Sequence, residues 1–248
     1  MKILDCTLRD GGYYTSWDFD RSIVETYFQS LNQLPVDYLE VGYRSMPMKD
    51  YMGEFFYTPV YVLEKIRQIC TKDLVIILNE KDVRPEHLPA LLHPIRGMVK
   101  MIRMAIDPKN LGRALVLAEG VKKMGFEVGF NVMYMSTWAG KQDFLSELKH
   151  VDGLADYFYM VDSYGGVYPQ DVVNTIGVVR QHTRVPLGFH GHNNMELGLI
   201  NSLTALDNGV EIVDATITGM GRGAGNLKTE LLLTVLSSRG QLSLDFNH

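Results

Sequence analysis

Near its start the chain carries the stretch Ile3-Leu4-Asp5-Cys6-Thr7-Leu8-Arg9-Asp10-Gly11-Gly12-Tyr13-Tyr14. An alternating apolar run that ends in an Arg-Asp pair and two glycines predicts a buried strand that delivers opposite charges into a tight turn. An exposed salt bridge contributes only about 0 to 1 kcal/mol, so stability alone is a weak reason for this ending. We therefore interpret Arg9 and Asp10 as site residues, the alternative being an ordinary solvated strand end.

Short apolar strands alternate with helical patterns along the rest of the chain. After the first strand we expect strands at 38–42, 74–79, 99–105, 127–134, 157–161, 187–190 and 212–217. We expect helices at 23–31, 60–70, just after Pro85, and at 111–124, 141–148, 170–181, 195–206 and 226–237. Strict alternation of eight strands and eight helices predicts an α/β fold, a (β/α)8 TIM barrel. A doubly wound open sheet is the alternative, because alternation does not show closure.

Composition sets limits on the class of protein. The 248 residues are 46% hydrophobic and 21% charged, and no Pro/Gly/Ser linker divides them, so we expect one domain over residues 1–248. A net charge of -5, without a cluster of Lys and Arg among aromatics, argues against nucleic acid or a membrane surface as partner. Cys6 and Cys70 predict packing roles in a reducing compartment. The start lacks an apolar signal core, so we expect a cytoplasmic protein.

Polar side chains recur where the expected strands end. They are Arg9-Asp10, Glu40, Asn79-Glu80, Arg103, Asn131, Asp162-Ser163, His190-Gly191-His192 and Thr218-Gly219. Ligands bind at the carboxyl ends of strands in barrels and in open parallel sheets alike, so this pattern predicts a small-molecule site. Asp162 and Asn79 are also good candidates for plain helix caps.

His190 and His192 form the second signal. Residues two apart on a strand point the same way, so both imidazoles can reach one point. If the barrel closes, the eighth strand lies between the seventh and the first, and Asp10 then faces both histidines across the mouth. Two imidazoles and one carboxylate suit Mn²⁺, Mg²⁺, Co²⁺ or Zn²⁺ and leave positions open for substrate, which is typical of a catalytic site. An open sheet would not bring these strands together.

The glycine-rich loop at 219–226 is the third signal. It contains a G-x-G-x-x-A match to the dinucleotide fingerprint, but that fingerprint belongs to an early βαβ unit with an acidic residue about 20 positions on. Here the chain is nearly over. We instead expect an anion cradle, with Gly221 and Gly223 contacting a carboxylate or phosphate at a helix N-terminus. A turn without a ligand is the alternative.

Five motifs together resemble the DRE-TIM metallolyases, also called the HMG-CoA lyase-like family, over nearly the whole chain. They are Asp5-Cys-Thr-Leu-Arg-Asp-Gly11, Glu40 in Leu-Glu-Val-Gly, Asp162-Ser-Tyr-Gly-Gly, His190-Gly-His-Asn-Asn and the closing glycine-rich loop. Residues 190–230 are most similar to the 4-hydroxy-2-oxovalerate aldolases. The resemblance implies that Asp10, His190 and His192 bind the metal, Mn²⁺ or Mg²⁺ before Co²⁺ or Zn²⁺. It also implies that Arg9 stabilises an enolate oxygen and that Glu40 is the acidic member of the triad for which the family is named. From the strand order we expect Glu40 to hold Arg9 from the neighbouring strand.

The chain departs from the family pattern at several positions. The loop after the eighth strand lacks the cysteine of the lyase branch, which disfavours a CoA-thioester lyase. Gly12-Tyr13 replaces the Glu-Gln that usually follows Arg-Asp-Gly in the synthase branch. The oxovalerate aldolases have a catalytic histidine where Tyr13 stands, so we predict that Tyr13 or water takes its place. They also carry a carboxyl-terminal extension that supports a dehydrogenase partner, and we assume no such partner here.

These features predict an aldolase/lyase-type catalytic domain. It would make or break a carbon-carbon bond next to a pyruvate-like 2-oxo acid through a metal-stabilised enolate, with an aldehyde as the other partner. We expect Ser163, Asn131 and Arg103 to contact substrate, with Arg103 clamping a carboxylate; the alternative for Arg103 is a buried ion pair. Other hypotheses are a Claisen-type acyl-CoA/2-oxo acid acyltransferase, isopropylmalate-synthase-like, and a non-catalytic 2-oxo-acid-binding barrel. The acceptor, the native metal and homo-oligomer formation stay open.

Overall fold

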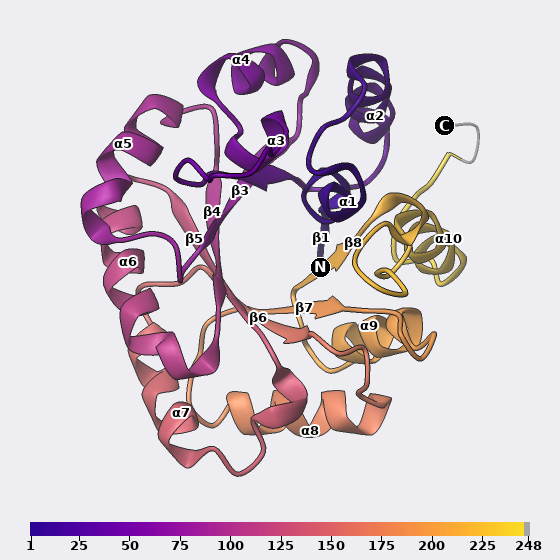
Figure 1. Ribbon diagram of the computed structural model, residues 1–248. Helices are drawn as coiled ribbons and strands as arrows, with labels where there is room; N and C mark the ends of the chain where they lie inside the picture. Colours follow the sequence, from indigo (N-terminus) through magenta and orange to yellow (C-terminus); the bar gives the residue numbers. More distant parts are fainter. Residues whose placement is uncertain (246–248) are drawn as a thin grey trace.

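The computed structural model describes residues 1–245, and within that span eight parallel strands close into a barrel in the order β1 to β8 (Figure 1). The strands are β1 (Lys2–Asp5), β2 (Tyr38–Tyr43), β3 (Asp73–Asn79), β4 (Met101–Ile106), β5 (Glu127–Val132), β6 (Tyr157–Asp162), β7 (Leu187–Gly191) and β8 (Ile212–Ala215). Closure comes from β8, which pairs in parallel with β1, with Ile3 opposite Val213. The predicted TIM barrel is confirmed, and the open-sheet alternative is wrong.

Helices surround the ring of strands (Figure 1). They are α1 (Thr7–Thr15), α2 (Arg21–Gln33), α3 (Glu54–Tyr57), α4 (Val60–Ile69), α5 (Leu88–Leu92), α6 (Leu111–Lys123), α7 (Gln142–Glu147), α8 (Pro169–Val179), α9 (Gly198–Asp207) and α10 (Thr229–Ser238). The predicted strict alternation was wrong at two points. Helix α1 is an additional helix between β1 and the expected α2, and α3 is an additional turn of helix between β2 and α4. No helix within residues 1–245 has the length and apolar character needed to cross a membrane.

The opening stretch differs from its prediction. Strand β1 ends at Asp5, and Arg9 and Asp10 lie inside helix α1 rather than at a strand end. The Asp5 carboxylate explains the change, because it accepts hydrogen bonds from the Thr7 backbone N–H at 2.9 Å and from the Thr7 hydroxyl at 2.6 Å. A side-chain acceptor for a free N–H at this point favours the start of a helix over a longer strand.

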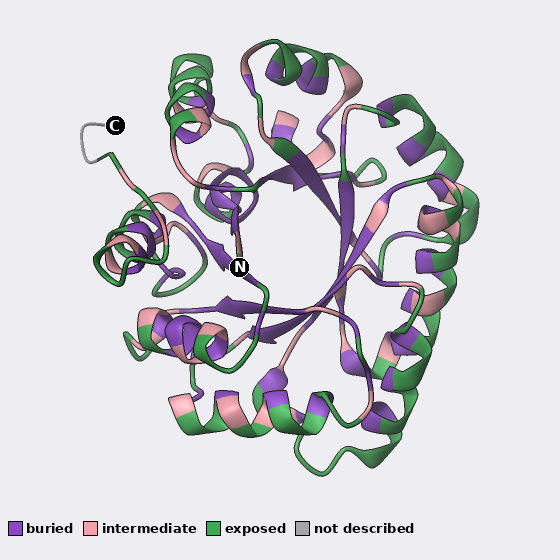
Figure 2. Ribbon diagram, turned by 180° about the vertical axis from the view of Figure 1, so that it is seen from behind, coloured by how far each residue is buried: buried purple, intermediate pink, exposed green. Residues whose placement is uncertain are grey.

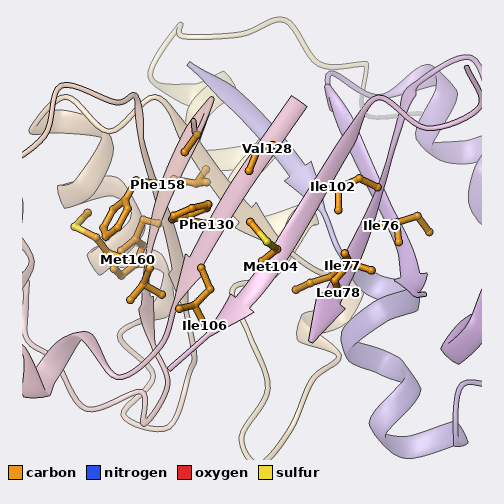
Figure 3. Packing of buried hydrophobic residues seen from close by; sticks show 14 of the residues in the cluster. Ile76, Ile77, Leu78, Ile102, Met104, Ile106, Val128, Phe130, Phe158 and Met160 are labelled. Carbon is orange, nitrogen blue, oxygen red and sulfur yellow. The ribbon is translucent and has the colours of Figure 1, made fainter. Parts of the chain in front are cut away.

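The main hydrophobic core lies between the strands and the helices. Figure 2 shows the strands buried and the outer helix faces exposed. Neighbouring strands contribute side chains such as Ile102, Val128 and Phe130, each with no measurable exposure (Figure 3). Helix α2 shows how local sequence sets an element, because Asp20 caps it and accepts from the backbone N–H groups of Ser22 and Ile23. Burial on this scale is the dominant stabilising contribution and holds the strand ends in place around the barrel mouth.

Candidate active site

The second glycine of helix α1, Gly12, allows the Trp17 ring to pack closely against the helix. A Cβ added at Gly12 would lie 2.0 Å from a ring atom of Trp17, so only glycine permits this packing. The Trp17 indole N–H in turn donates a hydrogen bond to the backbone oxygen of Arg9 at 2.8 Å. Gly12 and Trp17 therefore fix the turn of helix that carries Arg9 and Asp10.

The Asp10 carboxylate is buried and surrounded by polar groups. It is ion-paired with Arg9, and its Oδ2 accepts a hydrogen bond from the Asn226 amide at 2.7 Å. The same oxygen lies 3.5 Å from Nε2 of His190. Burial raises the pKa of the Asp10 carboxyl, but the Arg9 guanidinium and then the two imidazoles outweigh it, so the net pKa lies below the ordinary value. Asp10 is thus held as a carboxylate, the form that binds metal.

His190 lies in β7 and His192 directly follows that strand, and both side chains are oriented through their Nδ1 atoms. Nδ1 of His190 lies 2.8 Å from a carboxylate oxygen of Asp214, and Nδ1 of His192 donates to the backbone oxygen of Asp162 at 2.7 Å. Burial lowers the pKa of His190 well below its ordinary value, which keeps this imidazole neutral. The Nε2 atoms are therefore the ones left for a ligand, and the ring centroids lie only 4.9 Å apart. A second group that fixes the Nδ1 proton is typical of metal-binding histidines.

These groups fit a divalent cation. They offer two imidazole nitrogens and one carboxylate, and the Asn226 amide oxygen is buried without a hydrogen-bond partner among residues 1–245. Among the described residues, the set whose potential ligand atoms lie within 4.8 Å of one another is Cys6, His190 and Asp214, which includes neither Asp10 nor His192. That set is less suitable chemically, because burial raises the pKa of the Cys6 thiol well above its usual value, whereas Asp10 is held as a carboxylate. Asp10, His190 and His192 therefore stay our predicted ligands, on the chemistry of their donor atoms.

Arg9 is also held by Glu40. Its Nε donates to a Glu40 oxygen at 2.6 Å, which is the contact that we expected from β2. Glu40 has no exposed surface, and its other oxygen lies 3.2 Å from Nη1 of Arg103. Among residues 1–245 the Nη2 group of Arg9 forms no hydrogen bond, and Arg9 lines the pocket. Arg9 therefore has one free amino group to offer a bound molecule.

Arg103 corrects our prediction of a carboxylate clamp. It lies within β4 rather than at its end, is fully buried, and is absent from the pocket wall. Its donors contact Asp214 at 2.5 Å and Asn131 at 2.7 Å, and its guanidinium lies 4.1 Å from the ring centroid of Tyr159. Because partners inside the barrel occupy this side chain, Arg103 forms the buried ion pair that was our alternative.

A pocket of about 390 Å³ opens at the carboxyl ends of the strands. Of the predicted site residues, its wall contains Arg9, Tyr13, Asn131, Ser163, His190 and His192. Gly221 and Gly223 are outside this wall, whereas Arg222 between them is part of it. The predicted helix N-terminus at this loop is wrong, because α10 begins only at Thr229; contact of Gly221 and Gly223 with an anion stays a prediction. Gly221 instead makes room for Asn226, whose amide nitrogen would lie 2.7 Å from an added Cβ.

The structure also reveals site residues that we did not predict. Tyr43 lies in the pocket wall with its hydroxyl 3.1 Å from that of Tyr13, and burial raises its pKa well above the ordinary value. Asp214 holds His190, and Asn226 holds Asp10. Asp214 had a signal, since it is a lone acidic residue inside the apolar run Ile-Val-Asp-Ala. Asn226 had none beyond its place in the glycine-rich loop.

Comparison with known proteins places the chain among its relatives. Residues 98–248, more than half of the chain, match the HMGL-like family. The chain belongs to the HMGL-like family. A 4-hydroxy-2-oxovalerate aldolase of Pelotomaculum thermopropionicum is 31% identical over 99% of this chain and 73% of its own length. An oxaloacetate decarboxylase of Mycobacterium tuberculosis is 26% identical over 97% of this chain and 71% of its own length.

Solved structures agree with the fold. The crystal structure of the N-terminal domain of a candidate aldolase from Bacteroides vulgatus superposes with a TM-score of 0.98 and 62% identity. The match covers all of this chain and 83% of that one. The family resemblance expected from the motifs is therefore confirmed together with the barrel.

Proposed function

We propose that this HMGL-like protein is a divalent-metal-dependent carbon-carbon lyase of the aldolase type, with residues 1–248 as its catalytic domain. Its substrates would be a pyruvate-like 2-oxo acid and an aldehyde. The observation that carries the proposal is the Asp10 carboxylate 3.5 Å from Nε2 of His190, beside Arg9 with its free amino group, with Arg9, His190 and His192 in one pocket wall. The names of the aldolase relatives support the same chemistry.

Asp10, His190 and His192 would hold the metal, Mn²⁺ or Mg²⁺ for preference, with the Asn226 oxygen as a further donor. When bound, the metal supplies a Lewis acid that polarises the carboxylate and keto oxygens of the 2-oxo acid. Arg9 then acts on the negative charge that develops on the keto oxygen. Glu40 and Asp10 fix its guanidinium from two sides, so its free amino group needs no reorganisation to donate. Such a donor contributes about 2.7 to 4 kcal/mol to a transition state.

Tyr13 is our candidate for moving the proton of the substrate hydroxyl. Its side chain lines the pocket, 41% exposed, and its hydroxyl is positioned by the Tyr43 hydroxyl at 3.1 Å. In the cleavage direction a base takes this proton while the carbon-carbon bond breaks. Water remains the alternative base. Ser163 and Asn131 are substrate-contact candidates, but both already have partners, because Ser163 accepts from the Tyr134 N–H at 2.9 Å and Asn131 accepts from Arg103.

Enolisation can be tested without knowing the aldehyde. The metal-loaded protein is incubated with pyruvate in deuterated water, and loss of the methyl protons is followed by NMR. We expect exchange well above that of buffer and metal alone, and much slower exchange in the metal-free protein.

The same preparation tests the alternatives. Absence of exchange with any small 2-oxo acid, together with release of free thiol from acetyl-CoA, would favour the Claisen-type acyltransferase. That enzyme would use the same Arg9 and metal-ligand set. Absence of both pyruvate exchange and thiol release would favour a barrel that binds a 2-oxo acid without turnover.

A further inference from the structure

Arg222 is a pocket residue that the chemistry above does not use. It belongs to the loop between β8 and α10 and shares the pocket wall with His190 and His192. Its guanidinium lies 5.0 Å from the ring centroid of Tyr13, and the loop is tied to α1 by a hydrogen bond from the Tyr14 hydroxyl to the Gly223 oxygen at 3.2 Å. Arg222 is exposed, and within residues 1–245 its guanidinium has neither a hydrogen bond nor an ion pair. An unpaired cation thus stands beside the candidate base.

A second unpaired cation, Lys81, lines the same pocket from the loop after β3, and its amino group has no partner in the described part of the chain. The acidic residues of the wall do not offset these charges. Glu80 is paired with Arg113 at 2.5 Å, and Asp107 with Lys109 at 3.1 Å. Charges of one sign around a cleft attract ligands of the other sign. The pocket therefore favours a ligand that carries a further negative charge, in addition to the groups that the metal site and Arg9 would bind.

The pocket also has room beyond a 2-oxo acid. Its volume of about 390 Å³ corresponds to roughly a dozen heavy atoms, if each takes the share of about 30 Å³ that a water molecule has in the liquid. Pyruvate fills about half of that room. An acceptor as large as pyruvate itself therefore fits in the remainder, next to Tyr13 and Arg222.

We propose that the aldehyde partner carries an anionic group, a carboxylate or a phosphate, and that Arg222 binds this group with additional attraction from Lys81. The inference rests on the proposed aldolase function and specifies its substrate class. A guanidinium fork matches both carboxylate and phosphate with two parallel hydrogen bonds. On cleavage, the bond between C3 and C4 of a 4-hydroxy-2-oxo acid breaks, and its electron pair stays on the 2-oxo acid as the enolate. The C4 hydroxyl loses its proton to the base and becomes the aldehyde, so no oxidant or reductant is needed.

The test compares aldehydes in matched pairs, with pyruvate as the constant partner. One pair is 4-oxobutanoate and its neutral methyl ester; the other is glyceraldehyde 3-phosphate and glyceraldehyde. The metal-loaded wild type should prefer the charged member of at least one pair by about tenfold or more in kcat/KM, less so at high salt. The pair that shows the preference identifies carboxylate or phosphate as the recognised group.

Variants assign the preference to Arg222. In Arg222→Ala and Arg222→Gln the KM of the charged aldehyde should rise until the preference is lost, and Arg222→Lys should keep part of it. Arg184 offers a matched control, because it is exposed and precedes β7 at the opposite end of the barrel. Arg184→Ala should keep the wild-type preference.

Equal use of charged and neutral aldehydes by the wild type would overturn the inference. So would an equal loss with both members of a pair in Arg222→Ala, or failure of every aldehyde to react while exchange occurs. Pyruvate exchange in the wild type separates the two proposals. If exchange occurs without a charge preference, the aldolase proposal stands and this inference fails; if exchange is absent, both fail.

Discussion

Two arginines contact the same buried glutamate and do different work. Arg9, on α1, meets Glu40 at 2.6 Å and lines the pocket at the barrel mouth. Arg103, on β4, meets the other oxygen of Glu40 at 3.2 Å and is fully buried in the barrel interior. Arg103 is held by Asp214 and Asn131, and its Nη1 is buried near Glu40 without a hydrogen bond among residues 1–245, whereas Arg9 keeps one amino group free at the pocket. What separates the two arginines is where their unused donor lies: Arg9 is part of the pocket wall, whereas the unused Nη1 of Arg103 is buried inside the barrel.

The interior in turn supports the mouth. Glu40 binds Arg9 with one carboxylate oxygen and contacts Arg103 with the other, whereas Asp214 contacts both Arg103 and His190 with its Oδ2. Buried ion pairs are often no more stabilising than apolar packing, but removing one member leaves an unpaired buried charge. We therefore interpret this interior layer as a support that orients the groups above it.

His192→Ala should have the largest effect, because it removes one of two imidazoles at the mouth. Bound metal and turnover should both fall to background, as measured by elemental analysis and the pyruvate exchange assay. His93→Ala is the matched control, since His93 is exposed and outside the pocket. Full metal occupancy and turnover in His192→Ala would place the metal elsewhere.

Tyr13→Phe should lower turnover by about 10²- to 10⁴-fold, the usual contribution of a general base. The substitution removes only the Tyr13 hydroxyl, so steady-state turnover of wild type and variant measures the contribution of that hydroxyl to proton transfer. Tyr14→Phe is the control for the neighbouring hydroxyl. If Tyr13→Phe keeps the wild-type rate, Tyr13 is only a pocket wall, and the base is water, Tyr14 or a substrate group.

Arg103→Gln should mainly reduce stability. It leaves Glu40 and Asp214 without their shared cation inside the barrel, and loss of one partner of a buried pair costs about 3 to 5 kcal/mol. Urea unfolding of Arg103→Gln and of the exposed control Arg184→Gln measures this. A change in the free energy of unfolding below about 1 kcal/mol, or a rise in KM for the 2-oxo acid with intact stability, would indicate that Arg103 contacts substrate after all.

Arg9→Lys should show the opposite behaviour. Lysine keeps the positive charge but lacks the planar fork, so it cannot bind Glu40 and Asp10 and still offer a fixed donor. Turnover should fall by about 10²- to 10³-fold with metal content and urea midpoint close to wild type. Unchanged turnover would remove Arg9 from the mechanism and abolish the distinction between the two arginines.

Asp214→Asn tests the link between the two regions. The amide removes the charge that faces Nδ1 of His190, so metal affinity should weaken by about 10- to 100-fold. Metal titration should show the loss, and comparison with Arg103→Gln separates it from general destabilisation. Equal metal affinities in Asp214→Asn and wild type would mean that the interior does not orient His190.

The sequence predicted features that depend on neighbours along the chain. The spacing of apolar residues indicated the order and number of strands, and the two-residue period of a strand placed His190 and His192 on one side. Such regularities are local, because backbone geometry repeats every two residues in strands and every 3.6 in helices. With the family motifs, they were enough to predict the barrel and to suggest a metal site at its mouth.

Only the tertiary structure decided which polar groups are free. Asp10 meets Asn226 across 216 positions of the chain, and Arg103 meets Asp214 across 111. It also showed that Arg9 and Asp10 belong to a helix, because the turn begins where Asp5 finds its hydrogen-bond donors. A side chain's exposure and the partners that use its donors are set by residues brought together when the barrel closes. No local pattern contains that information, so the sequence identified Arg9 and Arg103 as candidates and the fold distinguished them.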